Sequence, residues 1–249
     1  MGFLNKLGMA VGVGASREGS RSLPNERKSS IGSHNSVATG TPHPPELQGI
    51  NRISNGLKEF LWNLDGLGRG TLLDLGPAWQ TTLSFFIERG FRVSSEDVLR
   101  GWADFSAEED LRTKDAKTVE EFAERSPEAK AKRFLKANLQ YAPASFDALL
   151  LWDVLDYLEP TLAKIVVAHL TDLLRPGAVV FAMFHSKKPE SFNRYRVADT
   201  NTLQVLASKP ICSSQKIYQN REIQDLFGKY RTMKSFVARD QLRETLFLK

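Results

Sequence analysis

The sequence contains a single cysteine, Cys212, in 249 residues, which excludes an intrachain disulfide and favours a reducing compartment. Its four histidines stand far apart with no ligand spacing around them, so we expect no metal site. No apolar run approaches the roughly 18 residues that a membrane-spanning helix requires. With 41% hydrophobic and 25% charged residues, the composition predicts a cytoplasmic globular protein without a transmembrane segment.

The first fifty residues have few large apolar side chains. They hold 8 of the 17 glycines, seven serines and four prolines, and Phe3 is their only aromatic residue. Such a segment buries too little apolar surface to offset the entropy of ordering it. We therefore predict a disordered tail at residues 1–50 and a folded domain at residues 51–249. The alternative is a short membrane-surface or partner-binding helix at the start of the tail.

After residue 52, short apolar runs alternate with amphipathic stretches of helical length. Apolar side chains at helical spacing predict a helix from Leu57 to Leu64, followed by Gly66. Strands are predicted at residues 71–75, 91–95, 133–138, 146–151, 178–184, 231–238 and 242–248. Further helices are predicted at residues 79–89, 118–131, 160–174 and 219–228.

The order of these elements indicates the fold class. Strands that alternate with helices form a mostly parallel sheet that is covered on both faces. Central strands are indicated by the nearly all apolar runs "FDALLLW" and "AVVFAMF". The last two strands have only residues 239–241, which include "DQ", between them, and this predicts an antiparallel hairpin at a sheet edge. We predict an α/β protein with a Rossmann-like doubly wound sheet of seven mostly parallel strands and an antiparallel C-terminal hairpin.

Ligands of such sheets bind beyond the carboxyl ends of the strands. The strand at residues 71–75 ends at Asp74-Leu75-Gly76, and a helix starting near Trp79 directs its N-terminal amides into the same crevice. The next strand ends at Glu96 and Asp97, at roughly the 20-residue spacing where a carboxylate accepts hydrogen bonds from ribose hydroxyls. These positions predict a site for a cofactor that contains a ribose. The alternative is that Glu96 and Asp97 only cap the next helix.

Several stretches between residues 71 and 249 resemble the class I methyltransferases that use S-adenosylmethionine. The first two motifs of that family are matched by "LLDLGPAWQTTLSFFIERGFRVSSEDV", and the fourth motif by "SFDALLLWDVLDYLEP". The later helix, turn and strand are similar to "DLLRPGAVVFAMF". The family's closing helix and hairpin resemble residues 218–249. The order and spacing of these stretches together carry the resemblance.

The resemblance implies S-adenosylmethionine as the cofactor and gives roles to the residues of the crevice. Asp74 would order the loop and bind near the cofactor's amino group, directly or through water. Gly76, with Pro77 and Ala78 after it, would let the backbone pass close to the methionine part. Asp97 would bind the ribose hydroxyls.

Further roles follow from the same resemblance. Glu96 is the second choice for the ribose. Asn138 and Leu139 occupy the place after the third strand where an acid usually meets the adenine amine, and the Asn138 amide oxygen can accept that hydrogen bond. Trp152 and Asp153 would line the crevice at the end of the fourth strand. The alternative for Trp152 is a core aromatic residue.

The loop departs from the family pattern at two positions, where Ala78 and Gln80 replace glycines. Ala78 adds one methyl group. The larger Gln80 either turns away and leaves a working site, or fills the space and leaves a fold without activity. The first outcome is favoured, because Asp74, Gly76 and Asp97 keep their spacing.

The chemistry of this family requires alignment and desolvation more than acid and base groups. A general base is needed only for an acceptor of high pKa, and His185 is the candidate; a surface or capping role is the alternative. The acceptor is a small molecule or a protein or nucleic-acid side group. Residues 187–249 carry 13 basic and six acidic side chains, which suits an anionic acceptor, RNA included, or only a solvated basic face.

Two other function classes stay open. A non-catalytic relative would keep the fold as a binding or scaffolding module. An NAD-dependent oxidoreductase would use the same crevice, but the hairpin ending fits that class less well and the sequence has no Tyr-x-x-x-Lys pair.

Overall fold

A computed structural model describes residues 49–112 and 126–249. The predicted tail lies outside these residues except at its last two positions, and so do residues 118–125 of one predicted helix. No helix in the described ranges is long and apolar enough to cross a membrane.

The main sheet has six strands in the order β3-β2-β4-β5-β9-β8. Neighbouring strands from β3 to β5 pair in parallel, whereas β5, β9 and β8 pair antiparallel. The strands are β2 (Gly70–Asp74), β3 (Phe91–Ser95), β4 (Phe146–Trp152), β5 (Leu174–His185), β8 (Thr232–Val237) and β9 (Leu242–Leu248). The mostly parallel sheet and its C-terminal hairpin are therefore confirmed, with six strands in place of seven.

The missing strand is the one predicted at residues 133–138, which is part of helix α5 (Pro127–Asn138). The Ser126 hydroxyl caps this helix by accepting a hydrogen bond from the Ala129 backbone N–H at 3.1 Å. Ala131, Phe134 and Leu135 recur at helical spacing and are buried on one face. The prediction of a strand was wrong because a short apolar run does not by itself distinguish the period of a helix from that of a strand. The helical period is visible only when the neighbouring residues are included.

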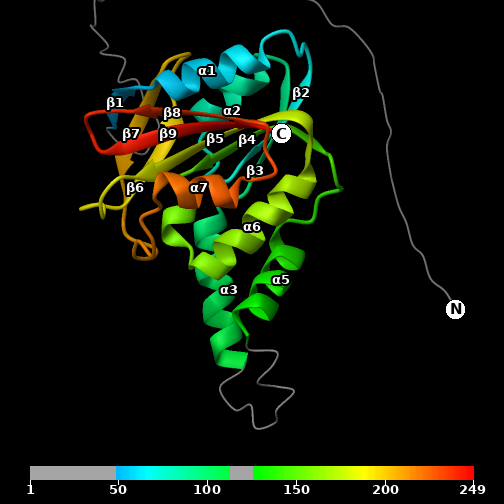
Figure 1. The fold of residues 1–249 in the computed structure, drawn as a ribbon, viewed down its shortest axis with the longest axis vertical. Coiled ribbons are helices and arrows are strands. Elements are labelled where there is room, and N and C mark those ends of the chain that lie inside the picture. The colour runs from blue at the N-terminus through cyan, green and yellow to red at the C-terminus, as the bar shows by residue number, and fades with distance from the viewer. Residues whose placement is uncertain (1–48, 113–125) are drawn as a thin grey trace, which may run out of the picture. The chain divides into compact units, whose positions relative to one another are not determined.

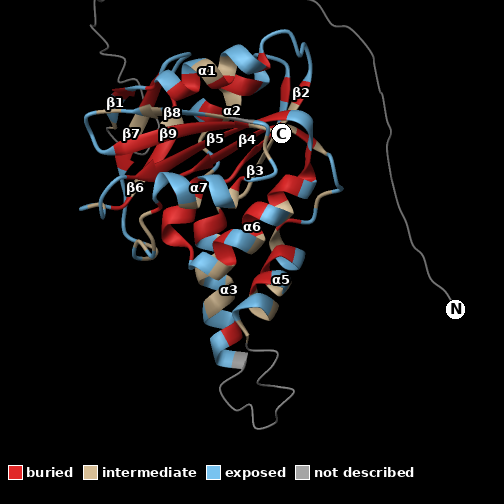
Figure 2. Ribbon diagram, in the orientation of Figure 1, coloured by how far each residue is buried: buried red, intermediate tan, exposed pale blue. Residues whose placement is uncertain are grey.

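Helices cover both faces of the main sheet, as predicted (Figure 1). One face carries α1 (Asn55–Leu64) and α2 (Gln80–Ile87), and the other carries α6 (Pro160–Leu173) and α7 (Asn220–Leu226). Helix α5 packs beside α6, and α3 (Val98–Arg112) packs beside α5. Each face has its own buried apolar cluster, and the four inner strands β2, β4, β5 and β9 are buried along most of their length (Figure 2).

A second, antiparallel sheet was not predicted from the sequence. It has the order β1-β7-β6 and consists of β1 (Ile50–Ile53), β7 (Thr202–Ala207) and β6 (Asn193–Val197). The Val197 backbone N–H of β6 donates to the Thr82 hydroxyl of α2 at 2.9 Å, and the Tyr195 hydroxyl donates to Asp153 at 3.2 Å. The small sheet therefore lies against the carboxyl ends of the main-sheet strands, where the sequence predicts the site.

Candidate functional site

Asp74 lies at the end of β2 and is 1% exposed. Its Oδ1 accepts hydrogen bonds from the Gly76 backbone N–H at 2.9 Å and from the Trp152 indole N–H at 2.6 Å. Its Oδ2 is buried and has no partner within the described ranges. Burial raises the pKa of Asp74 to about 6, because the bonds from Trp152 and Gly76 offset the loss of hydration only in part. The carboxyl group thus keeps one acceptor atom unused.

Trp152 ends β4 and fills the space beside Gly76. A Cβ atom at position 76 would lie 2.8 Å from the indole nitrogen, so only glycine lets the indole reach Asp74. Trp152 has a φ of +53°, a left-handed conformation that bulky residues rarely adopt. Its ring stacks on Tyr195 with 6.0 Å between centroids. Trp152 therefore stands at the predicted strand end and is also a buried core aromatic.

Asp97 directly precedes α3 and has two partners. Its Oδ1 accepts from the Arg100 backbone N–H at 3.2 Å, as a helix cap does. Its two oxygens also accept from Arg194 Nη2 of β6 at 2.9 and 3.0 Å. Neighbouring Glu96 accepts from the Tyr141 hydroxyl at 2.5 Å. The carboxylate that the sequence assigns to a ribose is thus held by an internal guanidinium.

Ala78 and Gln80 of the loop at residues 77–80 do not close the crevice with their side chains. Ala78 and Gln80 are exposed. The Gln80 amide nitrogen donates to the Ser84 hydroxyl at 2.9 Å along α2, so this side chain turns outward, as favoured from the sequence. The space next to Gly76 is limited by Trp152 instead.

Asn138 and Leu139 do not follow a strand, because the segment before them is α5. The Asn138 amide nitrogen donates to the Phe134 carbonyl of the same helix at 3.0 Å. Leu139 is 1% exposed and belongs to the core. Their predicted place beside an adenine depended on a strand that ends before them, and the structure has no strand at this position.

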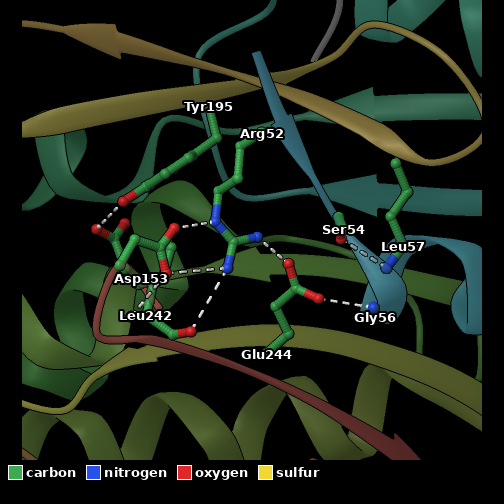
Figure 3. Close-up of polar contacts among 9 residues, drawn as sticks. Arg52, Ser54, Gly56, Leu57, Asp153, Tyr195, Leu242 and Glu244 are labelled. Atoms are coloured by element: carbon green, nitrogen blue, oxygen red, sulfur yellow. Dashed lines mark hydrogen bonds and ion pairs between the residues drawn. The ribbon is translucent and has the colours of Figure 1, made fainter. Parts of the chain in front are cut away.

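His185 is the last residue of β5 and lies among acids. Asp156 Oδ2 accepts from the His185 backbone N–H at 2.7 Å and lies 2.9 Å from Nδ1 of its ring. The other ring nitrogen, Nε2, is 3.9 Å from Asp153 Oδ2. Asp153 in turn accepts from the Tyr195 hydroxyl at 3.2 Å (Figure 3). The Nδ1 contact with Asp156 leaves Nε2 as the nitrogen that can exchange a proton.

Burial shifts the proton affinities in this group. Loss of hydration raises the pKa of Asp153 to about 7, although the charge of His185 opposes the shift. Burial alone would lower the pKa of His185, but the hydrogen bond to Asp156 and the charges of Asp153 and Asp156 outweigh it, so the pKa is raised. A proton is therefore held more firmly by this imidazole than by a free one.

Sequence reasoning missed the residues that β6 supplies. The strand reads "NRYRV", and residues alternate between its two faces. Arg194 reaches Asp97, while Tyr195 stacks on Trp152 and bonds Asp153. That alternation is the signal that could have predicted a strand here.

The small sheet is also tied to the hairpin edge of the main sheet (Figure 3). The Arg52 guanidinium of β1 bonds the carboxylates of Asp240 and Glu244. Glu244 accepts a further hydrogen bond from the Gly56 backbone N–H of α1 at 2.6 Å. Arg52 and Glu244 are both buried, so they form an internal ion pair rather than a solvated one.

Two cavities lie in different parts of the molecule. One of about 410 Å³ lies beside His185, between residues 185–193 and the β8–β9 turn at residues 239–241. Another of about 880 Å³ lies next to α1 and the amino end of β3. Neither is lined by Asp74 or Asp97.

No protein-family model and no curated protein matches the sequence. The chain is similar to S-adenosylmethionine-dependent methyltransferases of known structure. A 1,6-didemethyltoxoflavin N1-methyltransferase from Burkholderia thailandensis, solved with that substrate and S-adenosylhomocysteine, is 16% identical over 79% of each chain, with a TM-score of 0.42.

Two further methyltransferase structures give similar values. One from Aquifex aeolicus is 12% identical over 77% of this chain and 88% of its own, with a TM-score of 0.40. One from Methanosarcina mazei is 14% identical over 73% and 92%, with a TM-score of 0.38. At these identities the function has to be inferred from this chain's own residues.

Proposed function

We propose that this chain is an S-adenosylmethionine-dependent methyltransferase whose cofactor binds at the carboxyl ends of β2 and β3. One observation carries the proposal. Asp74, Gly76 and Asp97 stand together where two neighbouring parallel strands end, and Asp74 keeps a buried oxygen that has no partner among the described residues. Such ends are where open α/β sheets bind their ligands.

The side chains present suit the chemical groups of this cofactor. The Asp97 carboxylate can accept hydrogen bonds from two ribose hydroxyls, and Asp74 Oδ2 can accept one from an ammonium group. The backbone amides at the start of α2 carry partial positive charge for a carboxylate. The cofactor supplies a methyl group that its sulfonium already activates, so the chain has only to bind, orient and exclude water.

Two internal contacts compete with this binding. Arg194 holds both oxygens of Asp97, and the Trp152 indole fills the space beside Gly76. The proposal therefore includes a rearrangement in which Arg194 releases Asp97 and the indole leaves the loop. The cost of this step lowers the apparent affinity, since only the open form binds.

Calorimetric titration of the full chain with S-adenosylhomocysteine, S-adenosylmethionine and NAD tests the proposal. We expect binding of the first two and none of NAD. Asp97→Asn should weaken S-adenosylhomocysteine binding roughly tenfold, because a charge-assisted bond is lost. Asp172→Asn, which removes an exposed carboxylate of α6, is the matched control and should change nothing.

The proposal fails if neither the wild type nor an Arg194→Gln, Trp152→Ala double variant binds S-adenosylhomocysteine while remaining folded. The chain would then be a scaffold that kept the fold without the cofactor. Binding of NAD alone would instead favour the oxidoreductase.

A further inference from the structure

The cavity beside His185 is lined by more cationic groups than its carboxylates neutralise. Lys187, Lys188 and Arg239 all line it. Lys188 and Arg239 have no ion-pair partner within the parts of the chain that the structure describes. A cavity with unpaired cations attracts an anion, and it does so before any specific contact is made.

The two carboxylates of the cavity do not cancel this charge. Asp240 is already bonded by Arg52, and its pKa is lowered by that guanidinium despite its partial burial. Glu190 is almost fully exposed and lies 3.9 Å from Lys187. The remaining positive charge therefore faces the cavity from both of its walls, the segment after β5 and the β8–β9 turn.

His185 lines the same cavity. Asp156 holds the ring through Nδ1 and through the backbone N–H, which fixes the ring's orientation. The charged and titratable groups that face it are Asp153 at the end of β4, Asp156 in the short helix η1 (Val154–Tyr157), the Tyr157 ring and Asp240. A carboxylate behind an imidazole stabilises the imidazolium that forms when the ring takes a proton.

We infer that this cavity holds the methyl acceptor, that it selects an acceptor with an anionic group, and that His185 takes the acceptor's proton. The inference rests on the proposed function. Lys188 and Arg239 bind the anion, and neutral Nε2 of His185 accepts the proton of the acceptor's O–H or N–H. The freed electron pair bonds the methyl carbon while the carbon–sulfur pair stays with sulfur, and His185 then gives its proton to water.

The anion site can be tested without the cofactor, by following the ring protons of His185 in nuclear magnetic resonance during a titration with inorganic phosphate. We expect phosphate to shift the His185 signals and to raise the pKa of its ring, because a bound anion stabilises the imidazolium. A Lys188→Gln, Arg239→Gln variant should bind phosphate roughly tenfold more weakly. The matched control is Lys209→Gln, Arg221→Gln, which removes the same charge from exposed positions outside the cavity.

Equal loss of the phosphate response in both double variants, or no response in the wild type, overturns the anion site. The anion site is also contradicted if phosphate affects only the exposed lysines of the wild type and leaves the His185 signals unchanged. This readout is separate from the titration with S-adenosylhomocysteine, so the cofactor proposal and the anion site stand or fall independently.

The acceptor role is tested by measuring S-adenosylhomocysteine release with hydroxylated and aminated carboxylic acids against their methyl esters. We expect carboxylates to be used at least about tenfold better than esters, His185→Gln to lower the rate, and Asp156→Asn to shift its pH profile. Esters used equally well overturn the inference. So does a lack of turnover of every carboxylate by a protein that binds the cofactor.

Discussion

The carboxyl ends of β2 and β3 differ from the carboxyl end of β5 in what occupies the space beside them. At β2 and β3, the predicted ligand groups Asp74 and Asp97 are bonded by Trp152 and Arg194. At β5, His185 borders a cavity of about 410 Å³. Both places lie at the carboxyl ends of parallel strands, where open α/β sheets bind ligands. The difference comes from β6 together with Trp152 of β4, which cover the first place and leave the second open.

Removing Trp152 is expected to produce the largest change at the closed end. Trp152→Ala should cost about 3–5 kcal/mol of unfolding free energy, because it empties a fully packed position. Trp62→Ala is the control, since Trp62 is 74% exposed and its loss should cost less than about 0.5 kcal/mol. Urea unfolding followed by circular dichroism measures both. Similar costs at the two positions would mean that the indole is not what closes this end.

Asp74 gives the closed end a pH dependence of the next size. Its folded pKa of about 6 lies above the unfolded value of 3.8, so its contribution to stability is fully present below 3.8 and lost as pH rises through 6. Relative to Asp74→Asn, the wild type should therefore lose about 2–3 kcal/mol between about pH 4 and pH 7. Urea unfolding at several pH values measures this difference. The control is Asp172→Asn, whose difference in stability from the wild type should not depend on pH. A difference independent of pH would mean that Asp74 is not desolvated.

The sequence predicts the central strands of this fold better than the residues of β6 and β4 that lie over the strand ends. The runs at residues 146–151 and 178–184 are nearly all apolar, which favours buried strands, and Asp74 and Asp97 follow from where strands end. The pair between Asp97 and Arg194 joins residues 97 positions apart, and no local pattern encodes it. The same holds for Trp152 beside Gly76, where a glycine expected to approach a cofactor admits a side chain of the same chain.

Arg194→Gln sharpens the comparison by opening the ribose end without emptying the core. We expect it to tighten S-adenosylhomocysteine binding roughly tenfold, because the competing ion pair is gone and more of the protein is in the open form. Arg196→Gln is the control on the same strand, since Arg196 bonds Gln204 rather than Asp97. Calorimetry measures both. Weaker binding in Arg194→Gln would show that this guanidinium contacts the ligand instead of excluding it.

Gln80→Gly should have the smallest effect, although the sequence makes this residue the main departure from the resembled family. Its side chain is exposed and bonded to Ser84, so removing it frees no space for a ligand at the loop. We expect the affinity for S-adenosylhomocysteine to change less than about twofold, with up to about 1 kcal/mol of stability lost from the start of α2. Calorimetric titration with S-adenosylhomocysteine measures this affinity for Gln80→Gly and for a second variant that also carries Ala78→Gly. Tightening as large as that of Arg194→Gln would mean that the loop, and not β6 with Trp152, closes this end of the sheet.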